Sequence, residues 1–190
     1  MEHFRIAHMK YLQILIVLFL VVQTTHSQKR ISDSDIAVMK AKIENEVADL
    51  RKKSDTDIYT SAYEKQMNID FMIDTYRIDT LMARMICVDY SSQVMAQAAS
   101  IGTVAYDKLL NKYYKILMTK LSIADQETLK LAQRNWIQYR DSEIKLINAL
   151  SKIEYAGVGL DQRLFDAADI LEITKSRVIA IYEHLIGIQK

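Results

Sequence analysis

The sequence predicts an all-α fold, an antiparallel helical bundle built around a long central helical hairpin. The chain contains no proline and four glycines, so helix-breaking residues are scarce. Apolar residues recur at three- and four-residue spacings, and no pattern of alternating strands and turns interrupts them. From Gln28 to Lys190 the chain has 163 residues, which is enough for one domain with a sizeable core.

The N-terminal stretch has the pattern of an export signal. Arg5 and Lys10 precede an apolar run of eleven residues, 12–22, which is too short to span a membrane. Thr25 and Ser27 suit the positions before a cleavage site, so we expect residues 1–27 to form a signal peptide that is removed after Ser27. An uncleaved anchor is the alternative. No cysteine follows the run closely, which excludes a lipoprotein anchor and predicts a periplasmic or secreted protein with no stable membrane span.

The charge of the exported chain is balanced. Residues 28–190 contain 23 basic and 23 acidic side chains, and their net charge is zero. Nucleic-acid binding requires a basic surface, so the composition argues against a nucleic-acid partner. A zero net charge also predicts no long-range steering toward a cationic partner.

The first helix of the exported chain is expected to begin at Ser32 or Asp33. Five apolar residues follow at helical spacing: Ile36, Met39, Ile43, Val47 and Leu50. We interpret them as a packing stripe; a coiled-coil arm for dimerisation is the alternative, although the stripe is short for one. A polar break at 53–57 divides the chain into an N-terminal helical segment, 28–57, and a larger helical domain, 58–190.

The next helix is indicated from before Asn68 to Met85. Its charged residues lie mostly three or four positions apart and are expected to form surface ion pairs: Asp70, Asp74, Arg77, Asp79 and Arg84. The spacing of the three aspartates matches no calcium-binding loop, so we predict neither a metal site nor a cofactor.

Cys87 is the only cysteine in the chain. Its neighbours Ile86 and Val88 are apolar, and we therefore expect a buried and unreactive thiol. A mixed or intermolecular disulfide is the alternative for a lone thiol in an exported protein. After the polar residues 89–92, the small residues from Ala96 to Gly102 predict a close approach between helices.

The central hairpin is expected between Tyr106 and Ile147. Ser122 is a good helix N-cap, so the first helix ends before it and the second follows, folding back in the antiparallel direction. One face of the first helix carries Asp107, Leu110, Asn111, Tyr114 and Leu117. One face of the second carries Leu129, Ala132, Gln133, Trp136, Arg140, Glu143 and Ile147.

Polar residues occupy both inward faces of this hairpin. Antiparallel pairing about Ser122 brings Asn111 opposite Gln133 or Arg134, and Asp107 near Tyr139 or Arg140. We expect Asp107, Asn111, Gln133 and Arg140 to be largely buried and bonded to one another, because buried polar groups must find partners. The network then fixes the register of the hairpin, or, in the alternative, part of it lines a groove that binds a partner.

The last helix follows a loop-like stretch that contains Tyr155, Gly157 and Gly159. This stretch has neither a preceding strand nor the lysine of a phosphate-binding loop, so we interpret it as a turn. Asp161 is expected to begin the helix. The inward residues are then Leu164, Ala168, Leu171, Val178, Ile181, Tyr182 and Leu185.

Two motifs in the hairpin carry a family resemblance. The first is D-x-x-L-N-x-x-Y and the second is L-x-x-A-Q-R-x-W-x-x-Y-R-D. Their residues here are Asp107, Leu110, Asn111 and Tyr114, then Leu129, Ala132, Gln133, Arg134, Trp136, Tyr139, Arg140 and Asp141. Together they resemble the LprI-type lysozyme-inhibitor family, in its small helical N-terminal domain. A looser likeness, which includes Arg177, extends over much of 60–185.

The resemblance implies an exported, non-enzymatic protein whose partner is a lysozyme-type muramidase. Many members of the family carry a cysteine shortly after the Arg-Asp pair, at the position of Ile144 here. The disulfide that the resemblance implies at this place is therefore missing. We expect Tyr106, Tyr113 and Tyr155 to be available as anchors for the partner, because tyrosine is a common interface residue.

Residue combinations typical of catalysis are lacking in the exported sequence. Its only histidine is His184, the cysteine has no histidine near it in sequence, and no G-x-S-x-G motif occurs. Asp107 and Asp141 each lie near an arginine that would keep them ionised. We therefore predict a binding protein; an envelope structural or interaction protein unrelated to lysozyme and a peptidoglycan-active enzyme are the alternatives.

Overall fold

The computed structural model describes residues 30–54, 61–156 and 161–188. The predicted export signal, most of the polar break at 53–57, and Gly157 and Gly159 lie outside these residues. The described chain is helical throughout its regular structure, which confirms the all-α bundle. The helices are α2 (Asp33–Lys53), α3 (Ala62–Val88), α4 (Ser92–Lys120), α5 (Ile123–Leu150), the single turn α6 (Ile153–Ala156) and α7 (Gln162–Ile186).

Serine begins each of the four long helices α2 to α5. The N-cap residues are Ser32, Ser61, Ser91 and Ser122, and each has an extended backbone. The side-chain oxygen of each accepts a hydrogen bond from the N–H three residues later, at 3.0–3.4 Å. These bonds satisfy donors that have no partner inside the helix, so the start of each helix is set locally.

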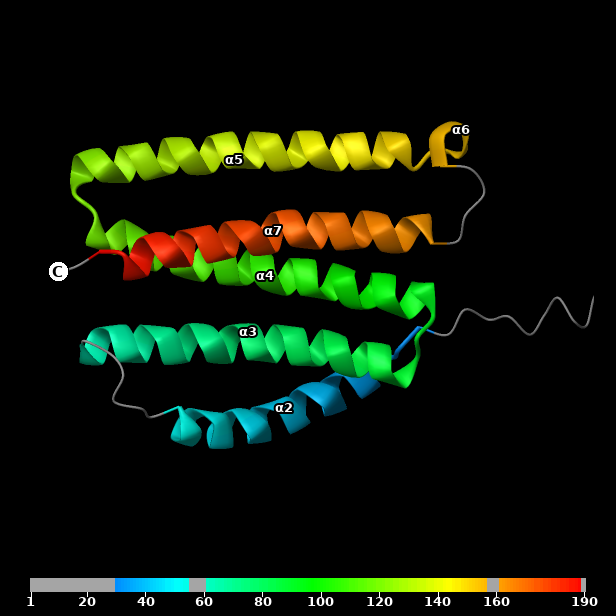
Figure 1. Ribbon diagram of the computed structural model, residues 1–190, viewed down its shortest axis with the longest axis horizontal. Coiled ribbons are helices and arrows are strands. Elements are labelled where there is room, and N and C mark those ends of the chain that lie inside the picture. The colour runs from blue at the N-terminus through cyan, green and yellow to red at the C-terminus, as the bar shows by residue number, and fades with distance from the viewer. Residues whose placement is uncertain (1–29, 55–60, 157–160, 189–190) are drawn as a thin grey trace, which may run out of the picture.

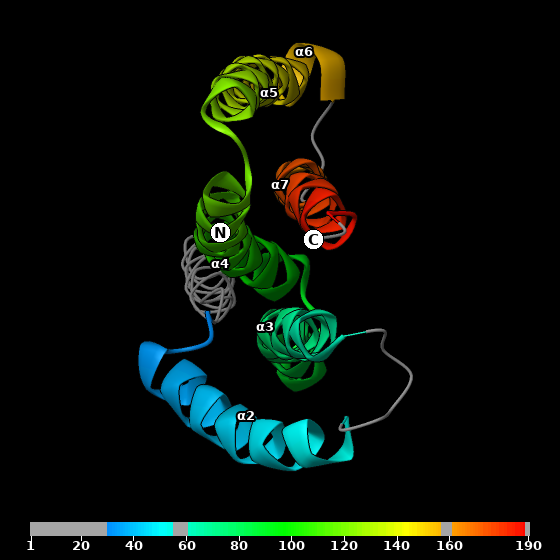
Figure 2. The ribbon, with the colours of Figure 1, turned by 90° about the vertical axis from the view of Figure 1, so that its left-hand side faces the viewer.

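The helices form a stack in which α7 lies between α5 and α4 (Figures 1 and 2). The most extensive packing is between α4 and α7, followed by α3 on α4 and α2 on α3. α4 and α5 run antiparallel and are joined through Leu121 and Ser122, as expected for the hairpin. α5 packs mainly against α7, and of its 28 residues only Leu129 is buried.

Two clusters of buried residues make the core. The first joins α4 and α7, where Phe71 stacks on Tyr182 with ring centroids 3.7 Å apart, and Tyr113 meets both rings edge-on. The second joins α2, α3 and the first half of α4. α4 continues without interruption through Gly102, where a Cβ atom would clash with the sulfur of Met82. The predicted close approach of helices is therefore present, between α4 and α3.

The N-terminal helix α2 packs on α3 by the predicted stripe, of which Ile36, Ile43 and Val47 are buried. On α7, the inward assignment is wrong for Ala168, which is exposed. No helix in the described part of the chain is both long and apolar enough to cross a bilayer.

Ion pairs join α2 to α3. Arg51 binds Asp70 at 2.9 Å, Arg77 binds Glu44 at 2.7 Å, and Arg84 binds Glu46. The charged residues of α3 therefore pair mainly with other helices, and only the Arg77–Asp74 contact of 3.5 Å keeps the expected spacing within α3. Reasoning from α3 alone missed these partners, because they come from another part of the chain.

The ion pairs between α2 and α3 predict that, as the pH falls, α2 loses its packing before α4 and α7 do. Hydrogen bonds from arginines of α3 lower the pKa of Glu44 and Glu46. Burial acts to raise the pKa of Asp70, but hydrogen bonds from Gln66 and Arg51 outweigh it and the pKa is lowered. Carboxylates with a lowered pKa stabilise the fold above their ordinary pKa and lose that contribution as the pH falls through the lowered value. At about pH 3 we expect amides of α2 to exchange hydrogen faster than those of α4 and α7, relative to neutral pH. Equal protection of all three helices would contradict this.

Candidate functional site

The family motif residues meet along the line where α4, α5 and α7 come together. We call this line the polar seam. It consists of Asp107 and Asn111 of α4, Gln133, Trp136 and Arg140 of α5, and Arg177 of α7. The Arg140 guanidinium lies 3.6 Å from Asp107 and also donates to Asp141 at 2.8 and 3.0 Å. The predicted pairing of Asp107 with Arg140 is confirmed, and it ties α4 to α5.

The other half of the predicted network is wrong. Asn111 donates to the backbone oxygen of Asp107 at 2.9 Å and to its carboxylate at 3.4 Å. Gln133 instead accepts a hydrogen bond from Arg177 at 3.1 Å. The reason is the position of α7: it takes the place beside α4 that hairpin pairing assigned to α5, so Gln133 meets α7.

The seam is also more solvated than predicted. The side chain of Asp107 is 48% exposed, that of Arg140 is 26% exposed, and Asn111 lies at the surface. The guanidinium carbons of Arg140 and Arg177 lie over the ring of Trp136, at 5.2 and 5.9 Å from its centroid. Burial lowers the pKa of the Arg177 guanidinium. The polar seam therefore places two guanidinium groups against the indole of Trp136. Its charged and amide side chains bind one another.

The remaining motif residues divide between core and surface. Leu110 and Leu129 are buried, and Tyr114 is half-buried. The exposed members are Ala132, Arg134, Tyr139 and Asp141. This division is what a structural motif on an amphipathic helix pair produces.

The solvation of the seam changes the expected effect of breaking it. A buried charge pair would lose roughly 3–5 kcal/mol when one partner is removed, whereas an exposed pair is worth roughly 0.2–1 kcal/mol. We expect a coupling energy below about 1 kcal/mol between Asp107→Ala and Arg140→Ala in a double-mutant cycle of urea unfolding. A coupling above about 2 kcal/mol would show that the pair is desolvated.

Two of the three tyrosines expected to face a partner are buried. Tyr106 and Tyr113 are fully enclosed, because α4 is covered by α3 on one side and α7 on another. The hydroxyl of Tyr106 donates to Asp79 at 2.7 Å, and that of Tyr113 donates to Asp74 at 3.0 Å. Burial, together with these carboxylates, raises the pKa of both phenols. Only Tyr155, which lies in α6, is exposed as expected.

The two aspartates that bind these tyrosines are only partly buried, and the sequence did not identify them as partners of the core tyrosines. Asp79 also binds Lys175 of α7 at 3.1 Å, and Asp74 also binds Lys112 of α4. Both aspartates therefore connect α3 to neighbouring helices through a cation and a phenol. The signal that could have found them is their position beside the apolar face of α3. Across the described ranges, no group of three or more metal-ligating side chains gathers.

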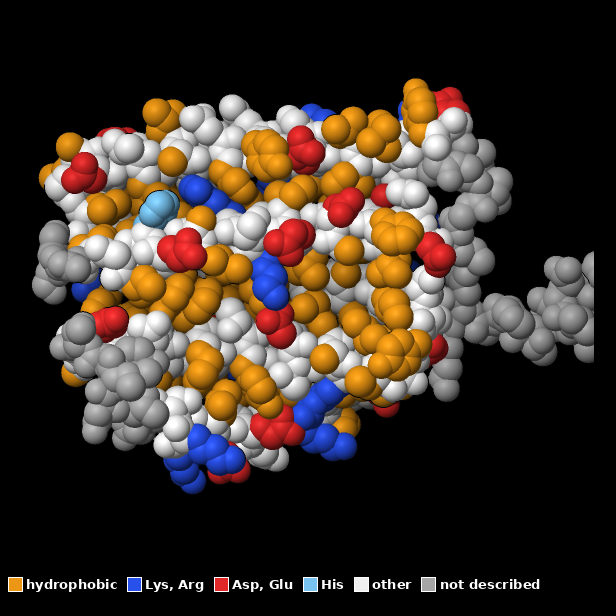
Figure 3. Space-filling model, viewed as in Figure 1, with side chains coloured by type: hydrophobic (Ala, Val, Ile, Leu, Met, Phe, Trp, Pro, Cys, Tyr) orange, Lys and Arg blue, Asp and Glu red, His pale blue; other side chains and the backbone are white. Residues whose placement is uncertain are grey.

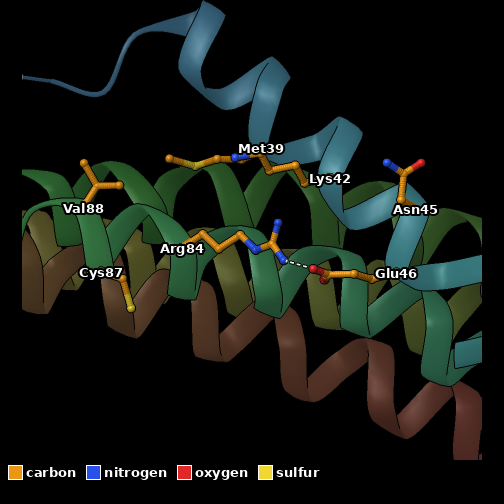
Figure 4. Close-up of a pocket in the computed structure, with 7 residues that line it drawn as sticks. All are labelled: Met39, Lys42, Asn45, Glu46, Arg84, Cys87 and Val88. Carbon is orange, nitrogen blue, oxygen red and sulfur yellow. Dashed lines mark hydrogen bonds and ion pairs between the residues drawn. The ribbon is translucent and has the colours of Figure 1, made fainter. Parts of the chain in front are cut away.

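A groove of about 530 Å³ lies between α2 and the end of α3 (Figure 4). Met39 and Val88 contribute apolar walls. Of its three charged residues, Lys42, Glu46 and Arg84, the last two form an ion pair with each other. Cys87 lines the groove and is exposed, so the prediction of a buried thiol is wrong. The apolar neighbours did not bury Cys87 because it lies in the last turn of α3, near the end of the bundle.

The comparisons with known proteins assign the family. The family model described as "Lysozyme inhibitor LprI" matches residues 87–180, from the last turn of α3 through most of α7. No curated protein and no solved structure matches the chain. The matched segment covers about half of the chain and contains every residue of the polar seam. Through residues 87–180, this chain belongs to the LprI family of lysozyme inhibitors.

Proposed function

We propose that the chain is an exported binding protein that inhibits a lysozyme-type muramidase and performs no chemistry of its own. The observation that carries this proposal is the LprI family match over residues 87–180. Both hairpin motifs that carry the family resemblance fall within this segment, and Asp107 and Arg140, one from each motif, contact each other across two helices.

The architecture suits an inhibitor. An inhibitor that blocks an enzyme's cleft needs a surface formed before binding, since ordering a flexible surface weakens affinity. The α4–α7 core is closed by stacked aromatic rings and by tyrosine hydroxyls bonded to aspartates. The helices that this core holds together offer such a surface.

Export places the protein where such an enzyme acts. The apolar run 12–22 and the small residues Thr25 and Ser27 support removal of a signal peptide and delivery to the periplasm or the exterior. Muramidases attack peptidoglycan in those compartments. Intact-mass measurement of the exported protein tests this part: the expected N-terminus is Gln28.

We expect purified residues 28–190 to slow the clearing of a cell-wall suspension by lysozyme. The assay measures turbidity with increasing amounts of the protein, using chicken-type and goose-type enzymes in parallel. An unrelated helical protein of similar size is the control for non-specific effects, and the protein without lysozyme shows whether it releases muropeptides itself. Unchanged clearing by both enzymes at tens of micromolar would reject the inhibitor and favour an envelope interaction protein.

A further inference from the structure

Large apolar side chains are exposed at one end of the bundle. This end combines the junction of α3 with α4, the end of α5, α6 and the start of α7 (Figure 1). Its exposed apolar residues are Val88, Tyr90, Leu150, Tyr155 and Phe165. Tyr90 is 71% exposed, Tyr155 67% and Phe165 58%. Figure 3 shows hydrophobic side chains along this edge with acidic side chains among them. We call it the acidic aromatic end.

Hydrogen bonds between helices hold this end in place. The hydroxyl of Ser92, the first residue of α4, donates to Asp161, which precedes α7. The hydroxyl of Ser151, at the end of α5, donates to Asp166 of α7 at 2.5 Å, and Gln162 donates to the same carboxylate at 2.9 Å. Phe165 therefore stands on a helix whose start is tied to α4 and to the end of α5 before any partner arrives, which reduces the entropy lost on binding.

The acidic aromatic end carries an excess of negative charge, although the net charge of the exported chain is zero. The described residues of this end, 88–92, 150–156 and 161–172, contain six acidic and two basic side chains. The acidic residues are Asp89, Glu154, Asp161, Asp166, Asp169 and Glu172. The acidic aromatic end therefore attracts cations, which the overall composition did not reveal.

We propose that the acidic aromatic end is the surface that docks a cationic protein, namely the muramidase, so this inference rests on the proposed function. The carboxylates match the positive charge of such an enzyme, and exposed tyrosine and phenylalanine provide side chains that enter a cleft. Phe165 is the first anchor, and Asp169 follows it by one turn on the same face of α7. Tyr155 is the second anchor.

Two substitutions test the contributions of the aromatic anchor and of the negative charge to binding one at a time. Phe165→Ala removes an exposed ring, and its control is Tyr139→Ala, an exposed ring on α5 away from this end. Asp169→Lys reverses an exposed charge, and its control is Glu183→Lys, which makes the same change of net charge toward the other end of α7. All four sites are exposed, so the folded structure should be retained, and far-UV circular dichroism with thermal unfolding verifies that it is.

Binding kinetics to immobilised chicken-type and goose-type lysozymes then test the surface. We expect Phe165→Ala to speed dissociation about tenfold, because anchor residues act mainly on the off-rate. We expect Asp169→Lys to slow association about threefold to tenfold at low salt, and this difference to shrink at high salt. Both controls should bind within about twofold of the unsubstituted protein.

Each outcome decides the proposal. Faster dissociation of Phe165→Ala and slower association of Asp169→Lys, with both controls unchanged, supports the acidic aromatic end. If the unsubstituted protein binds and all four variants bind equally well, the docking surface lies elsewhere and only this inference is overturned. If the unsubstituted protein binds neither enzyme, the docking surface and the proposed function are rejected together.

Discussion

Ile181→Asp is expected to abolish cooperative folding. Ile181 is completely buried on the face of α7 that packs against α4. An aspartate there loses its hydration, and the core formed by Val178, Leu185 and their neighbours offers no partner for it. An unpaired buried charge costs about 3–5 kcal/mol or more, which is comparable to the whole stability of many domains. Far-UV circular dichroism should show loss of the cooperative thermal transition.

The matched control for this substitution lies two residues earlier. Ile179 is on the same helix but is 37% exposed, so Ile179→Asp keeps its charge in water. We expect its free energy of unfolding to stay within about 0.5–1 kcal/mol of that of the unsubstituted protein. Equal effects of Ile179→Asp and Ile181→Asp would contradict the placement of α7 against α4.

Tyr113→Ala is expected to lower the free energy of unfolding by about 3–5 kcal/mol. The fully buried ring of Tyr113 meets Phe71 and Tyr182 edge-on, at centroid distances of 5.2 and 5.6 Å. Alanine leaves a cavity among these rings and removes the hydroxyl that binds Asp74. Urea unfolding followed by circular dichroism measures the loss.

Two companion variants divide this loss into its parts. Tyr113→Phe removes only the hydroxyl and should cost about 0.5–1.5 kcal/mol, the usual worth of one hydrogen bond. Tyr139→Ala removes an exposed ring from α5 and should change stability by no more than about 0.5 kcal/mol. A loss below about 1 kcal/mol for Tyr113→Ala would show that this ring is not enclosed by the core.

Local features of the fold were predictable from the sequence. The helix starts at Ser32 and Ser122 depend on a side chain and the backbone three residues later, so no distant contact is needed to recognise them. The stripe on α2 was predictable for the same reason, because its spacing alone identifies a buried face. The Asp107–Arg140 contact followed from antiparallel pairing of neighbouring helices.

Contacts with helices distant in sequence were not predictable in the same way. Hairpin reasoning considers only consecutive helices, and it therefore could not anticipate that α7 would lie between α4 and α5. Three errors share this cause: Gln133 was paired with Asn111 instead of Arg177, and Tyr106 and Tyr113 were expected to be exposed. A helix covered on two sides buries more of its circumference than its apolar stripe indicates.

The same difference between local patterns and contacts of distant segments applies to the candidate site. The motif residues were found from the sequence, because they stand at fixed spacings within one hairpin. The acidic aromatic end was not found, since Tyr90, Tyr155 and Phe165 come from three separate segments that only the tertiary fold brings to one end. Of its residues, Tyr155 alone was expected to face a partner.

We propose that the chain binds a muramidase and blocks it without chemistry of its own. The most direct measurement titrates lysozyme with residues 28–190 and follows two quantities in the same samples: the fraction of lysozyme bound, and the rate of cell-wall clearing. For an inhibitor, the clearing rate is expected to fall in proportion to the bound fraction and to reach its minimum when the enzyme is saturated. Saturated binding with undiminished clearing would contradict it, and so would the absence of binding to either enzyme class.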